Sequence, residues 1–124
     1  MLLTIDHVGI ACRNLDAAIE RYVSVFGLAV VSQETNTEQG VREAMLATES
    51  GTSYVQLLQP LSPDTPVGKF LEKRGEGMHH VGYAVADVSA ARKVLHFAPA
   101  HSDLTTIIRT AWAWHQQAHP RKAA

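Results

Sequence analysis

Two histidines lie inside short apolar segments of the chain that repeat one another. Residues 6–11 read DHVGIA and residues 79–84 read HHVGYA, so that His7 and His80 occupy equivalent positions. In both places a strand-like segment is followed by a helical pattern, which indicates one supersecondary unit used twice. A pseudo-twofold arrangement of the two copies would bring both imidazoles toward one shared cavity.

Gln56 is a third polar residue within an apolar strand, in the segment YVQLL over residues 54–58. Strand alternation places it on one face with Tyr54 and Leu58. Two imidazole nitrogens and an amide oxygen form a mixed set of ligands that suits a divalent transition ion such as cobalt, nickel, zinc or manganese. The alternative is that both histidines are ordinary hydrogen-bonded strand residues, and the residues alone leave both interpretations open.

Glu43 is the candidate for proton transfer, because it lies in the largely apolar segment VREAMLA over residues 41–47. A carboxylate that points into a partly dry cavity has a raised pKa and is a better general base near neutral pH. The other interpretation is an exposed strand residue that pairs with Arg42 or another neighbour, and the sequence alone favours this second interpretation. Cys12 has no neighbour pattern that would activate its thiol, so we expect a small buried apolar side chain there.

The elements that must position these residues follow from the spacing of apolar side chains. The predicted strands cover residues 5–12, 28–33, 41–48, 52–58 and 78–85. The predicted helices cover residues 15–26, 67–74 and 88–95, and their expected caps are Gly27, Thr65 and Asp87. Residues 5–58 therefore form a βαβββ unit, and the fold class is α+β.

The second copy of this unit has a strand and a helix but no counterpart of the last three strands. The partner that the repeat predicts for Gln56 would lie beyond the last residue. Residues 102–119 instead have the apolar spacing of a helix, in which His115 and His119 lie one turn apart. That spacing can bind a metal ion, but a packed or exposed pair is the interpretation that we favour. An unpaired sheet edge in the second copy would favour a homodimer or a larger assembly.

Composition limits the classes of protein to which the chain can belong. It has 124 residues, of which 46% are apolar and 19% are charged, with a formal net charge of −1. These values predict one globular domain and exclude general disorder. The near-neutral charge argues against a nucleic-acid partner, and no apolar segment is long enough to cross a membrane. A single cysteine cannot form an internal disulfide, which indicates a reducing compartment, so we expect a cytoplasmic protein.

Four segments of the chain resemble the methylmalonyl-CoA epimerases, a family of the vicinal oxygen chelate, or glyoxalase-like, superfamily of paired βαβββ modules. These segments are DHVGIA (6–11), EQGVRE (38–43), VQLLQP (55–60) and FLEKRGEGMHH (70–80). The resemblance extends from the start of the chain to about Arg92. It implies a glyoxalase-like domain over residues 1–95 with a truncated second module, followed by a divergent helical tail over residues 96–124.

The resemblance also implies an activity: an isomerase that removes and returns a proton at C2 of an acyl-CoA thioester with the help of a metal ion. Carried over by position, His7, Gln56 and His80 bind a divalent metal, typically cobalt, and Glu43 is one of two acid/base groups. The fourth ligand of the family, a glutamate that also transfers the other proton, has no match in this sequence. The alternative is a non-enzymatic, truncated or chimeric module that only dimerises or binds metal weakly.

The tail has a resemblance of its own. Residues 102–112, 114–115 and 119–120 resemble the C-terminal end of UDP-glucose 4-epimerase. The matching segment contains no catalytic residue, and the chain lacks the dinucleotide-binding half that sugar-nucleotide chemistry requires. The tail therefore implies a chimeric chain, joined between Arg92 and Ala100, without that chemistry.

Overall fold

The computed structural model describes residues 2–94 of the chain. The chain divides into two compact units, one of residues 4–84 and one to which residues 2–3 and 85–94 belong. The larger unit contains all the candidate site residues. The predicted tail helix over residues 102–119, with its pair of histidines, lies outside the described residues.

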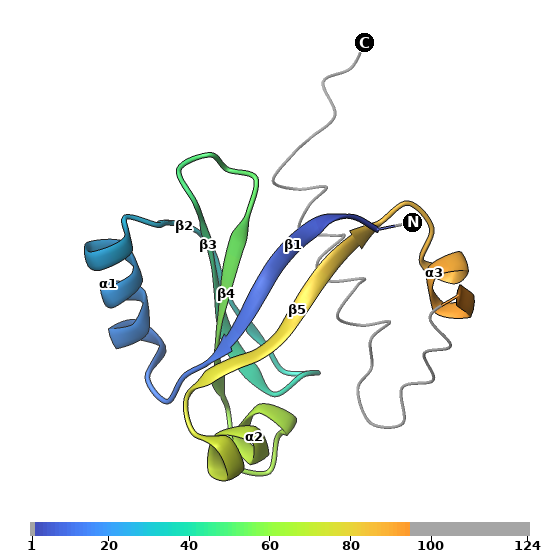
Figure 1. The fold of residues 1–124 in the computed structure, drawn as a ribbon. Coiled ribbons are helices and arrows are strands. Elements are labelled where there is room, and N and C mark those ends of the chain that lie inside the picture. The colour runs from blue at the N-terminus through green and yellow to red at the C-terminus, as the bar shows by residue number, and fades with distance from the viewer. Residues whose placement is uncertain (1, 95–124) are drawn as a thin grey trace. The chain divides into compact units, whose positions relative to one another are not determined.

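The described chain begins with the order βαβββ and continues with αβα (Figure 1). The strands are β1 (Leu2–Ala11), β2 (Ala29–Asn36), β3 (Val41–Ala47), β4 (Tyr54–Pro60) and β5 (Gly77–Val85), and the helices are α1 (Leu15–Phe26), α2 (Pro66–Arg74) and α3 (Val88–Val94). The α+β fold class and the predicted elements of this region are confirmed. Several element ends lie a few residues from the predicted positions.

All the strands form one sheet in the order β2-β3-β4-β1-β5. β1 and β4 pair in parallel, whereas β2 with β3 and β3 with β4 form antiparallel pairs. A parallel pair needs a crossover between its two strands, and α1, β2 and β3 provide it here. Because β1 and β5 are neighbours, the two strands that start the repeat copies lie side by side (Figure 1).

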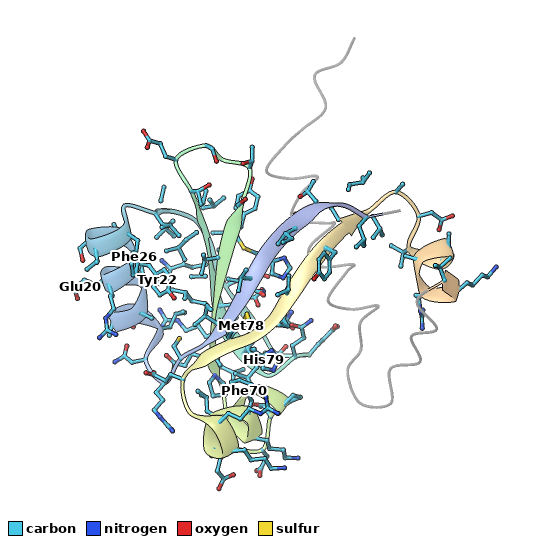
Figure 2. All side chains as sticks on the ribbon, viewed as in Figure 1. Glu20, Tyr22, Phe26, Phe70, Met78 and His79 are labelled. Carbon is cyan, nitrogen blue, oxygen red and sulfur yellow. The ribbon has the colours of Figure 1, made fainter. Side chains whose placement is uncertain are left out.

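The sequence of α1 explains both of its ends. The Asn14 side chain accepts a hydrogen bond from a backbone N–H of the first turn, and Gly27 ends the helix in the left-handed region at φ 70°. The apolar side chains at helical spacing, Leu15, Ala18, Ile19 and Tyr22, pack in or against the core, but Phe26, the next in this spacing, is 60% exposed. The core contacts come from the first two turns, and Phe26 lies one turn beyond them, with its ring centroid 5.3 Å from that of Tyr22 (Figure 2).

Strand alternation gives the sheet two differently packed faces. The face toward α1, which we call the helix face, contributes to a core of Cys12, Leu15, Ala44, Leu46 and Leu57. The opposite face, which we call the site face, carries Ala11, Val41 and Leu58, and these pack against Val67 and Leu71 of α2. Neighbouring residues such as Leu57 and Leu58 thus enter different cores, as the two-residue period of a strand requires. The sheet is held from both sides.

The two shorter helices begin with side-chain caps. The Thr65 hydroxyl accepts a hydrogen bond from the N–H of Gly68, and Pro66 occupies the first position of α2. In the smaller unit, Oδ1 of Asp87 accepts a hydrogen bond from the N–H of Ala90 at 3.1 Å and caps α3. Within residues 2–94, the helices are too short or too polar to cross a membrane.

Leu57→Ala tests the core of the helix face. Leu57 is fully buried, so the substitution leaves a cavity, and we expect the free energy of unfolding to fall by about 2–5 kcal/mol in chemical denaturation. The matched control is Val25→Ala, because Val25 is 68% exposed, and its truncation should change this free energy by less than about 0.5 kcal/mol. A loss for Leu57 no larger than that for Val25 would contradict the packing described above.

Candidate functional site

The candidate site residues lie on the site face of four strands. They are His7 of β1, Glu43 of β3, Gln56 of β4 and His80 of β5. In the strand register, Gly9 lies beside Gln56, and Glu43 lies beside Leu58. Register partners point to the same face, and side chains alternate along each strand. The sheet therefore turns His7, Glu43 and Gln56 toward the face that carries Leu58.

Two glycines let the histidine rings of β1 and β5 pack against the opposite strand. The ring of His80 occupies the space that a Cβ on Gly9 would fill, and the ring of His7 occupies the same space over Gly82. These contacts are reciprocal, as expected for antiparallel neighbours related by the repeat, and they place His80 on the site face. Packing thus requires the His-Val-Gly spacing, because the histidine ring of each copy fits only where the other copy has a glycine without a side chain.

The two rings meet edge to face, with their Nε2 atoms 3.1 Å apart and their planes at 85°. His7 is 2% exposed. Burial, together with the nearby rings of His7 and His79, lowers the pKa of His80 to about 4. Both histidines are therefore packed, hydrogen-bonded strand residues, and two nitrogens that face one point also suit a pair of metal ligands. The two interpretations drawn from the sequence do not exclude one another.

Each histidine has a second partner at its Nδ1 atom. Nδ1 of His7 lies 2.8 Å from Oδ2 of Asp6, and Nδ1 of His80 lies 2.9 Å from Nδ1 of His79. His79 also packs edge to face on Phe70 of α2, with centroids 4.9 Å apart (Figure 2), and burial lowers its pKa. Residue type alone does not single out Asp6 or His79, but the repeat could have found them, because each directly precedes its histidine.

The amide of Gln56 has a partner at one end only. Its Nε2 donates a hydrogen bond to Oε2 of Glu43 at 2.9 Å, whereas its Oε1 is buried and has no hydrogen-bond partner among the residues that the structure describes. A buried acceptor without a donor costs about 1–3 kcal/mol. Such an atom is typical of a site that binds an ion, a water or a ligand.

The donor atoms fit a divalent transition ion. Two nitrogens bound to one ion at about 2.1 Å are about 3.0–3.4 Å apart, and the Nε2 atoms of His7 and His80 are 3.1 Å apart. Gln56 lies beside Gly9 in the sheet, and the ring of His80 packs over Gly9. Gln56, whose Oε1 has no partner among the described residues, is therefore a neighbour of the two histidines. In residues 2–94, no three His, Cys, Asp or Glu side chains are grouped to hold a metal ion. A third donor to an ion at the histidine pair would therefore be of another type, and the amide oxygen of Gln56 is one.

Glu43 is buried, and this overturns the expectation of an exposed residue paired with Arg42. The side chain is 8% exposed, because alternation turns it to the site face. Alternation turns Arg42 the other way, where its guanidinium binds Asp16 of α1 at 2.7 and 3.0 Å. The pKa of Glu43 is raised to about 8, first by burial and then by the hydrogen bond and charge of Glu34, while the hydrogen bond from Gln56 opposes this rise. Glu43 can therefore hold or release a proton near neutral pH.

Cys12 is the buried apolar side chain that the sequence predicts. It belongs to the core of the helix face, and burial raises the pKa of its thiol to about 11. A thiol with so high a pKa forms little thiolate near neutral pH and is unreactive.

Comparison with known proteins agrees with this fold. Residues 6–98 match the family described as the Glyoxalase/Bleomycin resistance protein/Dioxygenase superfamily. The ethylmalonyl-CoA/methylmalonyl-CoA epimerase of Cereibacter sphaeroides is 34% identical over 101 residues, which cover 81% of this chain and 74% of that protein. The uncharacterized protein YqjC of Bacillus subtilis is 42% identical over 79 residues, which cover 64% of this chain. The match spans only about half of YqjC, 55% of its length.

A solved structure supports the same relationship. A variant of the Streptomyces coelicolor methylmalonyl-CoA epimerase, in complex with 2-nitronate-propionyl-CoA, is similar with a TM-score of 0.70 and 48% identity. The similarity covers 77% of this chain and 71% of that one. The likeness of the tail to UDP-glucose 4-epimerase stays a prediction. The chain therefore belongs to the glyoxalase/bleomycin resistance protein/dioxygenase superfamily, in which its relatives include methylmalonyl-CoA epimerases.

Proposed function

We propose that the chain is an isomerase of the methylmalonyl-CoA epimerase type, which removes and returns the proton at C2 of an acyl-CoA thioester. One observation carries this proposal. The buried carboxyl group of Glu43, whose pKa is raised, is hydrogen-bonded to Gln56, and the amide oxygen of Gln56, which has no partner among the described residues, neighbours the imidazole pair. Epimerisation needs a base for the C–H proton and positive charge near the oxygen that becomes negative. These residues supply the base and can hold the charge.

Glu43 is the proposed base. With a pKa of about 8, its ionised carboxylate binds a proton more tightly than an exposed glutamate with a pKa of about 4.3, and it therefore removes a C–H proton more readily. The amide of Gln56 holds Oε2 of Glu43 at 2.9 Å and orients the carboxyl group. Glu34, its register partner on β2, is exposed and gives the proton a route to water.

His7, His80 and Gln56 are the proposed metal ligands, through two Nε2 atoms and one Oε1 atom. The unpartnered Oε1 and the 3.1 Å spacing of the nitrogens support this set. We propose cobalt as the ion, and zinc, nickel or manganese suit the same donors. A divalent ion held there would supply positive charge that stabilises the negative charge developing on the substrate during proton removal.

A non-enzymatic module that only dimerises or binds metal weakly is the second candidate, and it is not favoured. Such a module gains nothing from the buried carboxyl group of Glu43 or from the unpartnered oxygen of Gln56, and both lower the free energy of unfolding. Polar groups that break the packing rules in this way are typical of functional sites.

Further properties belong to the same proposal. The substrate is an acyl-CoA, the glyoxalase-like domain covers residues 1–95, and the divergent tail covers residues 96–124. β5 is the end strand of the sheet within the described part of the chain, which supports a homodimer, since a free strand edge favours association. The single buried cysteine, Cys12, suits the reducing cytoplasm.

Proton exchange and epimerisation test the proposed reaction. With methylmalonyl-CoA and Co²⁺ in heavy water, we expect deuterium to enter C2, and Glu43→Gln to slow this exchange by about 10²-fold or more, because an amide does not accept the proton. A single base returns a proton to the face from which it came, so exchange should be faster than conversion of one stereoisomer into the other. NMR measures the exchange, and a coupled stereospecific assay measures the conversion.

Glu20→Gln is the matched control for this experiment. Glu20 is exposed on the outer side of α1, so its loss should leave the exchange rate unchanged (Figure 2). Exchange that survives Glu43→Gln would remove Glu43 from the mechanism. The absence of any exchange by the wild-type chain with Co²⁺ bound would favour the non-enzymatic module.

The stability of the metal-free chain should depend on pH through Glu43. Its pKa is about 8 in the folded chain and about 4.3 in an unfolded one, so the stabilisation from its proton is complete below about pH 4 and is lost as the pH rises toward 8. We expect the free energy of unfolding to fall between about pH 5 and pH 8, and Glu43→Gln to remove most of this fall. Urea titrations at several pH values, with a chelator present, measure the free energy of unfolding of both proteins. An equal fall of this free energy with pH in the two proteins would contradict the raised pKa.

The metal site predicts different effects for two histidines. His80→Ala removes one of two nitrogen donors and should abolish binding of Co²⁺, whereas His115→Ala, in the tail, should leave the affinity unchanged. Isothermal titration calorimetry on protein without a histidine tag measures both. Equal losses from the two substitutions would mean that a tail histidine binds the ion.

A further inference from the structure

The hydrogen bonds of the histidine pair form one continuous line through Asp6, His7, His80 and His79. Its three links measure 2.8, 3.1 and 2.9 Å. The repeat that matches His7 with His80 also matches Asp6 with His79. The two copies therefore present different groups, a carboxylate and an imidazole, to equivalent nitrogen atoms.

When the rings are neutral, Asp6 determines which atom donates and which accepts in each of these three hydrogen bonds. A carboxylate only accepts hydrogen bonds, so Nδ1 of His7 carries the proton of that ring, and its Nε2 is an acceptor. Nε2 of His80 must then donate to His7, which makes Nδ1 of His80 an acceptor for the Nδ1–H of His79. This one arrangement of tautomers satisfies all three hydrogen bonds.

An ion between the two Nε2 atoms requires a different arrangement, because a nitrogen that binds a metal ion cannot carry a proton. The proton of His80 must then lie on Nδ1, where it is donated to Nδ1 of His79, and the proton of His79 must lie on its Nε2. His80 and His79 each lose the proton of one nitrogen and gain one at the other nitrogen, so both rings stay neutral and no net proton is lost. Asp6 and His7 keep the same arrangement in both states.

We propose that His79 is a positioning residue that lets His80 adopt both tautomers, the paired one without an ion and the ligand one with it. This inference rests on the metal ligands of the proposed function. An imidazole Nδ1 can donate or accept, whereas the carboxylate at the equivalent position in the first copy, Asp6, only accepts. The ring of His79 is held in place by edge-to-face packing on Phe70 at 4.9 Å (Figure 2) and on His80 at 5.2 Å.

Three substitutions of His79 separate this role from a purely structural one. His79→Asn keeps a group that can accept or donate and should hold the affinity for Zn²⁺ within about threefold of wild type. His79→Phe keeps an aromatic ring without the hydrogen bond and should weaken the affinity about tenfold. His79→Asp only accepts, so it selects the ligand tautomer of His80. It should strengthen the affinity about tenfold and destabilise the zinc-free chain, in which two Nε2 lone pairs would then face each other.

Calorimetry with Zn²⁺ measures the affinities, and NMR of ¹⁵N-labelled imidazoles at about pH 8.5, where a reference histidine is neutral, measures the tautomers. In the wild type we expect the proton of His80 on Nε2 without zinc and on Nδ1 with zinc. In His79→Asp we expect it on Nδ1 in both states. Met78→Asp is the matched control, because Met78 is 63% exposed. It adds the same charge nearby without this hydrogen bond and should change the affinity less than about twofold.

Three results would overturn the inference: the same His80 tautomer with and without zinc in the wild type, equal affinities in the three variants of His79, or no zinc binding by either the wild type or His79→Asp. None of these measurements uses epimerase activity. A chain that binds zinc and changes the tautomer of His80 without epimerising methylmalonyl-CoA would refute the proposed reaction and leave the role of His79 intact.

Discussion

The site depends on one reciprocal packing contact between β1 and β5. The ring of His7 fills the space over Gly82, and the ring of His80 fills the space over Gly9. Because neither glycine has a side chain, both rings can lie against the opposite strand, and their Nε2 atoms come within 3.1 Å of each other. A side chain at either glycine would displace the ring above it and separate these nitrogens.

Keeping polar groups on a buried sheet face costs stability, and the two apolar cores offset that cost. Burial raises the pKa of Glu43 to about 8, and Gln56 keeps one oxygen without a donor among the described residues. Both belong to strands whose neighbouring side chains, Leu57 and Leu58 among them, pack into cores on opposite faces. The hydrogen bond from Gln56 to Glu43 joins the part of the site that can hold an ion to the part that can move a proton.

The repeat produces a symmetric frame with unlike partners. His7 and His80 occupy equivalent positions, but His7 is bound by the carboxylate of Asp6 and His80 by the imidazole of His79. A carboxylate fixes the tautomer of its neighbour, whereas an imidazole can accept or donate. Equivalent positions in the fold can therefore hold one ring whose tautomer is fixed and one ring whose tautomer can change.

The sequence by itself determined the secondary structure, the repeat and the pairing of His7 with His80, because apolar periodicity, helix caps and a repeated motif are local signals. It could not decide between a buried and an exposed Glu43, and it favoured the wrong one. That choice depends on which face of β3 meets the site-face core and on the register of β3 with β2 and β4, which joins segments distant in the chain. The repeat could have singled out Asp6 and His79, but only the tertiary structure decided that they bind the rings and that Oε1 of Gln56 has no partner among the described residues. Hydrogen bonding depends on distances that no local pattern specifies.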